Sequence, residues 1–356
     1  MTADAAIVAA WRERVRAATA EKPLCLRGGG SKDFYGGLPT GEILDTREYA
    51  GIIDYEPTEL AITVRCGTPL AEVEAALGER QQMLACEPPR FGAATLGGTV
   101  AAGLSGPRRA AAGAVRDFVL GVRMMDGEGR VLQFGGRVMK NVAGYDVSRL
   151  MAGTLGTLGL ILEVSLKVLP RPAAETTLRL EMAQTAALAA LNRWAGQPLP
   201  ISASCWHDGV IMVRLSGARA AVAAARAKLG GETLADGEAF WESLREQRHP
   251  FFAGTAPLWR LSLPSVAMPF EFDSAPLVEW GGSQRWLRGE HDAEGIRAVA
   301  ARAGGHAVLF RGAAAEERAA GVFAPLPAPL LALQRRIKAA FDARGVFNPG
   351  RLYPLI

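Results

Sequence analysis

Short apolar runs alternate with turn residues and amphipathic stretches over the first eighty positions. Residues 5–20 have an alanine-rich helical pattern, and the apolar residues 24–26 predict a short strand that leads into a cluster of glycines. Residues 61–66 predict a second strand, and the apolar spacing within residues 70–77 predicts a helix after it. This part of the chain therefore predicts β-turn-α units.

Residues 92–159 combine strand-like segments with fifteen glycines in 68 residues. Residues 118–125 and 131–134 read as two strands, and the Asp-Gly-Glu-Gly linker at 126–129 is typical of a hairpin. A longer strand is predicted over residues 158–169. Glycine at this density among strands is expected where the backbone adopts a positive φ or approaches a ligand closely.

A change of pattern follows Pro170-Arg171-Pro172, which we take as the first domain boundary. Beyond it, short strands and alanine-rich helices predict a small α+β domain with an antiparallel sheet. The predicted strands are 177–182, 201–207, 210–216, 258–263 and 307–311, with helices ending at 194 and spanning 218–229 and 293–303. We expect an α+β protein with a first domain at 1–171, a reduced cap domain at 172–325 and a C-terminal segment at 326–356, amphipathic over 329–344, that returns to the first domain.

Composition narrows the class of protein. The chain has 356 residues, enough for two domains, and a formal net charge of +4, which gives little support to nucleic-acid binding. Four cysteines lie at least 20 residues apart, so closely spaced redox, zinc or iron–sulfur ligand pairs are excluded. We expect a reduced, cytoplasmic protein without a signal peptide or anchor helix, and we expect no metal site.

Several common catalytic motifs do not occur. The glycine cluster has Asp33 where a G-x-G-x-x-G fingerprint needs its third glycine, and no Gly-Lys pair exists to form a P-loop. There is no G-x-S-x-G and no H-E-x-x-H motif. All four histidines, which are His207, His249, His291 and His306, follow the glycine-rich region, so a histidine-based triad or metal site within that region is excluded.

The cluster Arg27-Gly28-Gly29-Gly30-Ser31 directly after a predicted strand fits an anion-binding loop. Consecutive backbone N–H groups without Cβ atoms can turn toward a phosphate, while Ser31 adds a donor and Arg27 or Lys32 adds positive charge. A plain glycine-rich turn is the alternative.

Several segments together resemble a known family. The motifs, in order, are Arg27-Gly-Gly-Gly-Ser31, Ala94-Thr-Leu-Gly-Gly-Thr-Val-Ala101, Leu104-Ser-Gly-Pro-Arg-Arg109, Gly113-Ala-Val-Arg-Asp117, Lys140-Asn-Val-Ala-Gly-Tyr-Asp146 and Gly153-Thr-Leu-Gly-Thr-Leu-Gly159. Their order and spacing resemble the FAD-binding domain of the vanillyl-alcohol oxidase (p-cresol methylhydroxylase, PCMH) flavoproteins over about 150 residues. Cys86-Glu-Pro-Pro-Arg90 and Phe347-Asn-Pro-Gly-Arg-Leu352 are most similar to the FAD-binding E subunits of bacterial glycolate oxidases, or glycolate dehydrogenases.

The resemblance implies a two-subdomain FAD-binding domain and a set of cofactor contacts. Gly28, Gly29, Gly30 and Ser31, with Arg27 and Lys32, would hold the pyrophosphate. Thr95, Gly97, Gly98, Ser105 and Gly106 would line the flavin and ribityl chain, with Val115 and Ile161 near the adenine. Gly113, Asp117, Gly153 and Gly156 complete the expected set, although the segment 153–159 could equally be a buried turn.

Two departures from the family pattern bear on chemistry. Covalent flavin attachment in this family commonly uses a histidine of the FAD-binding domain, and none precedes His207, so we expect non-covalent FAD. Relatives that oxidise hydroxy acids carry a Glu-His-Gly-x-Gly motif, whereas the corresponding stretch here, residues 310–316, has no histidine. His306 and Arg311 could supply a base and a carboxylate-binding group, but a structural role for His306 is favoured, and we assign no catalytic residue.

The resemblance also implies a place in a complex. The chain would be the FAD-binding subunit of a glycolate oxidase that converts glycolate to glyoxylate, together with its catalytic flavin-containing D subunit and its iron–sulfur F subunit. Electrons would pass toward a quinone pool rather than to NAD, and membrane contact would come only through the partners. The alternatives are a stand-alone 2-hydroxy-acid dehydrogenase, for example for D-lactate, a structural or electron-relay subunit, and an NADPH-dependent reductase. Residues 249–259 could be a partner surface, although a core role is favoured.

Overall fold

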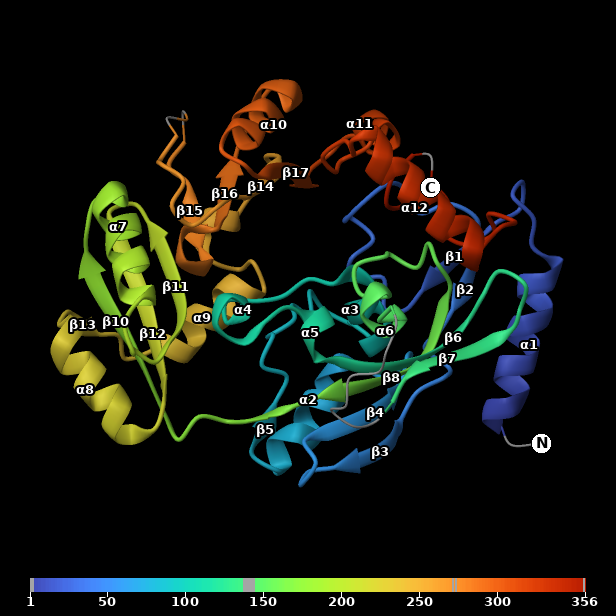
Figure 1. The fold of residues 1–356 in the computed structure, drawn as a ribbon, viewed down its shortest axis with the longest axis horizontal. Coiled ribbons are helices and arrows are strands. Elements are labelled where there is room, and N and C mark those ends of the chain that lie inside the picture. Colours follow the sequence, from blue (N-terminus) through green and yellow to red (C-terminus); the bar gives the residue numbers. More distant parts are fainter. Residues whose placement is uncertain (1–2, 137–144, 271, 273, 355) are drawn as a thin grey trace.

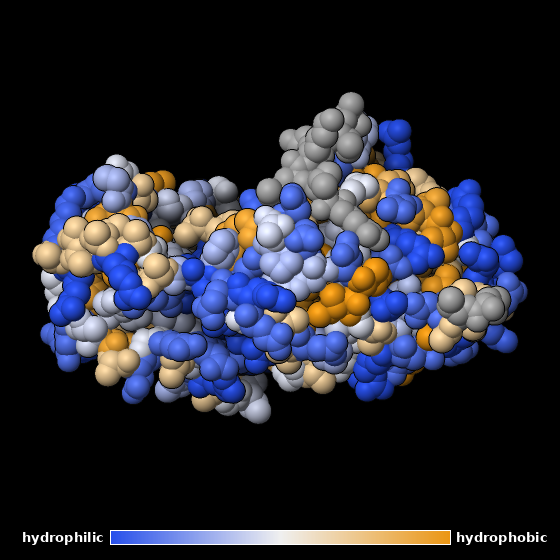
Figure 2. All heavy atoms as spheres, turned by 90° about the horizontal axis from the view of Figure 1, so that it is seen from below, coloured by the Kyte–Doolittle hydropathy of each residue, from blue (hydrophilic) through white to orange (hydrophobic). Residues whose placement is uncertain are grey.

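A computed structural model describes residues 3–136, 145–270, 272, 274–354 and 356. The chain forms two regions that lie side by side, and its C-terminal residues return to the first of them (Figure 1). Seen from below this view, the surface is mostly hydrophilic with small, separate apolar areas (Figure 2). No helix within the described ranges is long and apolar enough to cross a membrane.

The N-terminal region holds short helices around small sheets. Its elements are α1 (Ala3–Ala17), β1 (Leu24–Arg27), β2 (Glu42–Asp45), β3 (Ile52–Glu56), β4 (Ala61–Arg65), α2 (Leu70–Glu79), β5 (Gln82–Met83), α3 (Leu96–Ala102), α4 (Arg109–Ala112), α5 (Val115–Phe118), β6 (Val119–Met125), β7 (Val131–Gly135), α6 (Val147–Leu150), β8 (Leu160–Lys167) and β9 (Leu169–Pro170). Strands β3-β4-β8-β6-β7 form a five-stranded antiparallel sheet, β5 pairs with β9, and β1 pairs in parallel with β2.

Local chemistry explains the hairpin between β6 and β7. The Asp126 carboxylate accepts hydrogen bonds from the backbone N–H groups of Glu128 (3.0 Å) and Arg130 (2.9 Å), which closes the predicted turn. One prediction for this region is wrong. The strand at 24–27 does not lead into a helix, because the glycine loop continues through turns to the parallel strand β2, and only β4 and α2 form a β-turn-α unit.

The second region, here called the cap, is built on one large sheet. Its elements are β10 (Ala174–Glu181), α7 (Gln184–Ala195), β11 (Ile201–His207), β12 (Val210–Gly217), α8 (Arg219–Leu229), β13 (Glu232–Thr233), α9 (Gly237–Arg245), the 3-10 helix Pro250–Phe252, β14 (Leu258–Ser262), β15 (Leu277–Glu279), the 3-10 helix Trp280–Gly282, β16 (Gln284–Arg288), α10 (Ala293–Arg302), β17 (His306–Arg311) and α11 (Ala315–Ala320). The strand order is β13-β10-β12-β11-β15-β16-β14-β17, with antiparallel pairing throughout.

Successive side chains of a strand point to opposite faces of this sheet, and each face is covered by other elements. One face, which includes Leu258, Trp286 and Phe310, packs against Tyr35 and Leu104 of the N-terminal region. The other face packs against helices: the inner residues of β11 and β12 contact α7 and α8, and those of β14, β16 and β17 contact α10. The sheet therefore joins the two regions and also carries the cap helices.

The C-terminal segment completes the N-terminal region. After α12 (Ala328–Phe341), the chain runs beside β1, where the Leu24 N–H donates to Val346 O (2.8 Å) and the Asn348 N–H donates to Leu24 O (3.0 Å). The predicted α+β class and antiparallel cap sheet are confirmed. The boundaries at residues 171 and 325 stay a prediction.

Candidate functional site

The glycine loop after β1 is pressed against a second loop, residues 93–95. A Cβ atom built on Gly29 would lie 1.4 Å from the Ala93 carbonyl oxygen, and one on Gly28 would lie 2.2 Å from Thr95 Oγ1. Gly30 has a φ of +70°, a conformation that residues with a side chain rarely adopt. Glycine is therefore favoured at these positions before any ligand is considered: at 29 by contact between two backbones, at 28 by the Thr95 side chain and at 30 by the positive φ.

The second loop is held in turn by β4 and α2. The Leu70 N–H donates to Ala94 O (2.8 Å) and the Gly97 N–H donates to Cys66 O (2.8 Å). Thr95 caps α3, its Oγ1 accepting from the Gly98 N–H at 3.3 Å. A Cβ on Gly97 would lie 2.6 Å from Cys66 Cβ, so this glycine permits close packing of α3 on β4.

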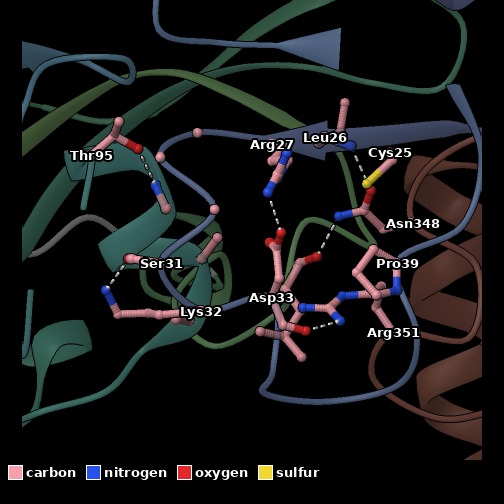
Figure 3. Close-up of a pocket in the computed structure, with 17 residues that line it drawn as sticks. Cys25, Leu26, Arg27, Ser31, Lys32, Asp33, Pro39, Thr95, Asn348 and Arg351 are labelled. Atoms are coloured by element: carbon pink, nitrogen blue, oxygen red, sulfur yellow. Dashed lines mark hydrogen bonds and ion pairs between the residues drawn. The ribbon is translucent and has the colours of Figure 1, made fainter. Parts of the chain in front are cut away.

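The two loops and the C-terminal segment enclose one pocket, here called the glycine-loop pocket (Figure 3). Ser31, Lys32 and Thr95 lie on one side of it, and Arg27, Asp33 and Arg351 lie together on the other. Its full lining is Cys25, Leu26, Arg27, Gly28, Gly29, Gly30, Ser31, Lys32, Asp33, Pro39, Thr95, Gly98, Ala101, Ala102, Leu155, Asn348 and Arg351.

The lining has an excess of positive charge, with three cations and one carboxylate. Arg27 Nη2 pairs with Asp33 Oδ2 at 2.7 Å, while Arg27 Nε is buried without a hydrogen-bond partner among the described residues. Among the described residues, Lys32 Nζ reaches only oxygens of uncharged groups, Ser31 Oγ (3.3 Å) and Arg90 O (3.4 Å). Burial lowers its pKa to about 8. Burial and the nearby Arg318 lower the pKa of Arg351 to about 10. Two buried cations, Lys32 and Arg351, beside an unused donor on the partly exposed Arg27 fit an anionic ligand.

The wall opposite the glycine loop comes from the C-terminal segment. Asn348 Oδ1 accepts from the Leu26 N–H at 2.7 Å, and its Nδ2 donates to Leu155 O at 2.6 Å. Arg351 Nη1 donates to the carbonyl oxygens of Asp33 (3.3 Å) and Gly37. These residues were not predicted as site residues, although the Asn-Pro-Gly-Arg motif that contains them is among those that carry the family resemblance.

Eight of the predicted cofactor residues line this pocket: Arg27, Gly28, Gly29, Gly30, Ser31, Lys32, Thr95 and Gly98. The other nine lie elsewhere: Gly97, Ser105, Gly106, Gly113, Val115, Asp117, Gly153, Gly156 and Ile161. Two of them, Ser105 and Gly106, line a separate small cavity against the cap sheet. Ser105 Oγ accepts from the Val115 N–H (3.1 Å), and Asp117 Oδ2 accepts from the Ala114 N–H (2.8 Å). A cofactor role for all seventeen residues stays a prediction.

Some other motifs of the sequence have no part in this pocket. His306 is exposed at the start of β17, and Arg311 donates to Phe252 O (2.9 Å) and Gln247 Oε1 (3.2 Å), so neither lines the pocket. Within residues 249–259, Phe251, Phe252 and Trp259 are buried, which agrees with the favoured core interpretation. Residues 140–144 of the Lys-Asn-Val-Ala-Gly motif lie outside the described residues.

Comparison with known proteins identifies the class. A sequence model described as an FAD binding domain matches residues 4–135. The chain is 50% identical over 343 residues to the glycolate oxidase subunit GlcE of Escherichia coli (strain K12), covering 96% of both chains. It is 30% identical over 158 residues to the glycolate oxidase subunit GlcD of Bacillus subtilis (strain 168), which is 44% of this chain and 34% of that one.

A solved structure supports the same fold. The 4-ethylphenol oxidase from Gulosibacter chungangensis matches with a TM-score of 0.69 at 13% identity, covering 98% of this chain and 88% of that one. The fold and the matching domain define a flavoprotein with a PCMH-type FAD-binding domain. FAD is its cofactor. The chain belongs to the family of FAD-dependent oxidoreductases that contains the glycolate oxidase subunit GlcE.

Proposed function

We propose that this chain is the FAD-binding subunit of a glycolate oxidase complex that oxidises glycolate to glyoxylate and passes the electrons to an acceptor other than NAD. The observation that carries this proposal is the 50% identity to a glycolate oxidase subunit over nearly the whole of both chains. The cation-rich glycine-loop pocket agrees with it, because a diphosphate needs both close backbone approach and positive charge.

The residues of the pocket fit the diphosphate of FAD. Arg27 Nε is a buried donor without a partner among the described residues, and Lys32 is a buried cation without a carboxylate partner there. In this proposal Lys32, Arg27 and Arg351 offset the charge of the diphosphate, and Ser31 donates a hydrogen bond to it. FAD, when bound, supplies the two-electron acceptor. The cofactor is held non-covalently, because no histidine lines the pocket.

We propose that the chain works as part of an enzyme complex. The names of the two relatives, subunits GlcE and GlcD, support an enzyme of several different subunits. We propose that the chain works beside a second flavin subunit and an iron–sulfur subunit, and that it is a cytoplasmic protein that meets the membrane only through them. Closely spaced cysteines do not occur in its own sequence, which agrees with an iron–sulfur cluster carried by another chain.

The visible spectrum tests this proposal. The chain is purified alone and after co-expression with the two partner subunits, and each sample is recorded anaerobically before and after glycolate is added. We expect about one FAD per chain, released by denaturation without acid hydrolysis, and bleaching of the flavin by glycolate in the assembled complex. A complex that keeps an oxidised spectrum with glycolate, or whose flavin is reduced by NADPH instead, would contradict the proposal.

A further inference from the structure

The last helix of the chain, α12, differs from the other long helices in what it buries. In the described part of the chain, each of the other helices of nine or more residues has at least two buried residues, for example Trp11 of α1 and Ile296 of α10. α12 has 14 residues and none of them is buried. It lies at the edge of the molecule, on the outside of the N-terminal region (Figure 1). Since helices in proteins are stabilised mainly by packing of an apolar face, α12 has an apolar face that is incompletely covered.

The end of α12 is fixed to the N-terminal region. Lys338 Nζ donates to the carbonyl oxygens of Thr157 (2.7 Å) and Phe347 (3.0 Å). Ile337 and Phe341 pack against the core of that region. The helix therefore has a defined position and orientation within this chain alone.

The start of α12 presents the same apolar stripe to solvent. Four apolar residues spaced by three or four positions follow one side of the helix: Leu330, Leu333, Ile337 and Phe341. Ile337 and Phe341 are partly covered by the core, whereas Leu330 is 50% exposed and Leu333 is 49% exposed. The stripe thus continues for about one turn beyond the surface that covers it.

The charges of α12 all have the same sign. The helix contains Arg335, Arg336 and Lys338 but no Asp or Glu. Lys338 pairs with Asp342 at 2.6 Å, while Arg335 and Arg336 are exposed and have no ion pair among the described residues. Arg336 follows Leu333 by three residues, so it lies beside the open part of the stripe.

This combination of charge and apolar surface limits what can cover the helix. A second copy of α12 would bring arginines against arginines, which opposes association, whereas carboxylates on another protein would complement them. A membrane surface fits less well, because helices that lie in the lipid interface have a long apolar face, and here only Leu330 and Leu333 are open. Charge complementarity therefore favours an acidic, amphipathic protein segment.

We propose that Leu330, Leu333 and Arg336, here called the α12 surface, bind an amphipathic helix of a partner protein. Apolar side chains of that helix cover the two leucines, and a carboxylate pairs with Arg336. The partner is another subunit of the oxidase complex, and this part of the proposal rests on the proposed function. The α12 surface lies apart from the glycine-loop pocket, since none of its residues lines that pocket.

Stability of the assembled complex tests the proposal. The full-length, FAD-loaded chain is co-expressed with the second flavin subunit and the iron–sulfur subunit, and mass photometry of the diluted complex gives the apparent Kd. Leu330→Ser combined with Leu333→Ser should raise this Kd at least tenfold at low and at high salt, because apolar contacts are lost. Arg336→Glu should raise it about tenfold at low salt and less at high salt, because salt screens the ion pair.

Two controls match these variants. Arg335→Glu makes the same charge change on the same helix, but position 335 is two residues from Leu333 and points to nearly the opposite side, so the Kd should change less than twofold. Val266→Ser combined with Met268→Ser removes two apolar side chains of the cap that are 73% and 68% exposed, and it should not affect assembly.

FAD content and melting temperature are measured on every variant. We expect both to stay as in the unmodified chain for Arg336→Glu and Arg335→Glu, since these side chains are exposed and lie outside the glycine-loop pocket. If the double serine variant at 330 and 333 does not fold, the comparison of Arg336→Glu with Arg335→Glu is sufficient to test the surface.

Several outcomes would overturn the α12 surface: a Kd within twofold of the unmodified value in both of its variants, or equal effects of Arg336→Glu and Arg335→Glu. Two other results would assign the leucines to a different occupant and also overturn it. These are dimers of the chain alone, or its binding to phosphatidylglycerol vesicles, that the double serine variant loses. In each of these cases a complex that oxidises glycolate leaves the proposed function intact.

The opposite combination separates the two proposals from the other side. If the α12 variants block assembly as expected but the unmodified complex does not oxidise glycolate, the α12 surface stands and the proposed function is wrong. An unmodified chain that retains neither subunit would overturn both.

Discussion

The glycine-loop pocket is lined mainly by loop residues, whereas the small cavity between the cap sheet and residues 104–107, here called the inter-region cavity, has one wall made of strand side chains. In the pocket, glycines at 28 and 29 let two loops touch, and cations line the remaining space. In the cavity, Arg260, Glu279 and Gln284 come from three strands of the cap sheet. The first arrangement suits an anionic cofactor that approaches the backbone closely, whereas in the second the shape of the cavity depends on side chains that strand pairing brings together.

The largest effect is expected from Gly29→Val. Its Cβ would lie 1.4 Å from the Ala93 carbonyl oxygen, so the glycine loop cannot keep its position against residues 93–95. We expect near-complete loss of FAD, measured as the flavin-to-protein absorbance ratio of the purified protein. Gly196→Val is the matched control, because a Cβ there meets only Arg193 O at 3.7 Å. Full flavin retention in Gly29→Val would mean that FAD binding does not depend on the close approach of the glycine loop to residues 93–95.

The next largest effect is a loss of unfolding free energy when an ion-pair cluster between the two regions is broken. Glu87 pairs with Arg214 of β12 (2.9 Å) and Arg108 (3.2 Å), both almost fully buried. Burial alone would raise the pKa of Glu87, but these two arginines lower it on balance, so its stabilising effect is present at neutral pH and is lost as the pH falls through that lowered pKa. Glu87→Ala should cost about 3 kcal/mol of unfolding free energy at pH 7.

Chemical denaturation at pH 7 measures this loss. Glu181→Ala, which breaks an exposed ion pair with Arg179 on the same sheet, should change the free energy little. Equal effects of the two substitutions would show that the buried cluster does not hold the regions together.

A smaller effect is expected from Glu279→Gln, and it depends on pH. Burial raises the pKa of Glu279 to about 7, and the titratable or charged groups near it are Cys205, Glu87, Arg245 and Arg260. A raised carboxyl pKa means that the folded state binds more protons between about pH 4.5 and 7, so this residue lowers stability as the pH rises through that window.

The glutamine variant should therefore gain stability over the unmodified chain at pH 8, on the order of 2 kcal/mol, and much less at pH 5. Melting temperatures at the two pH values give the comparison, with Glu181→Gln as the exposed control. A difference that does not change between pH 5 and pH 8 would mean that Glu279 is not the group that titrates.

The smallest effect is expected from Lys32→Met. Loss of one cation from the glycine-loop pocket should weaken FAD binding about tenfold, because the other cations remain. Since the pKa of Lys32 is lowered to about 8, FAD affinity of the unmodified chain should fall as the pH rises above 8, and this fall should be smaller in the variant. Fluorescence titration of the apoprotein with FAD measures both, with the exposed Lys22→Met as control. An FAD affinity that is unchanged in Lys32→Met would show that Lys32 does not contribute to FAD binding.

Sequence alone could predict the glycine-loop pocket better than the inter-region cavity, for a physical reason. Residues 27–32 form a contiguous run after a strand, and glycine spacing records where backbones touch. Asn348 and Arg351 were not predicted as site residues because nothing local signals that they lie beside Leu26. The polar row of Arg260, Glu279 and Gln284 is set by strand pairing across the cap sheet, and β15 and β16 were not predicted, because their three to five residues carry little periodicity.

The pairing of Asn348 with Leu26 across 322 residues has a consequence for the life of the protein in the cell. On the ribosome, the glycine loop emerges early, but Asn348 and Arg351, which form the opposite wall of the pocket, are added only after the whole cap has been synthesised. If this pocket holds FAD as proposed, we expect cofactor loading to follow translation rather than accompany it. A nascent chain that stalls before residue 348 lacks one wall of the pocket.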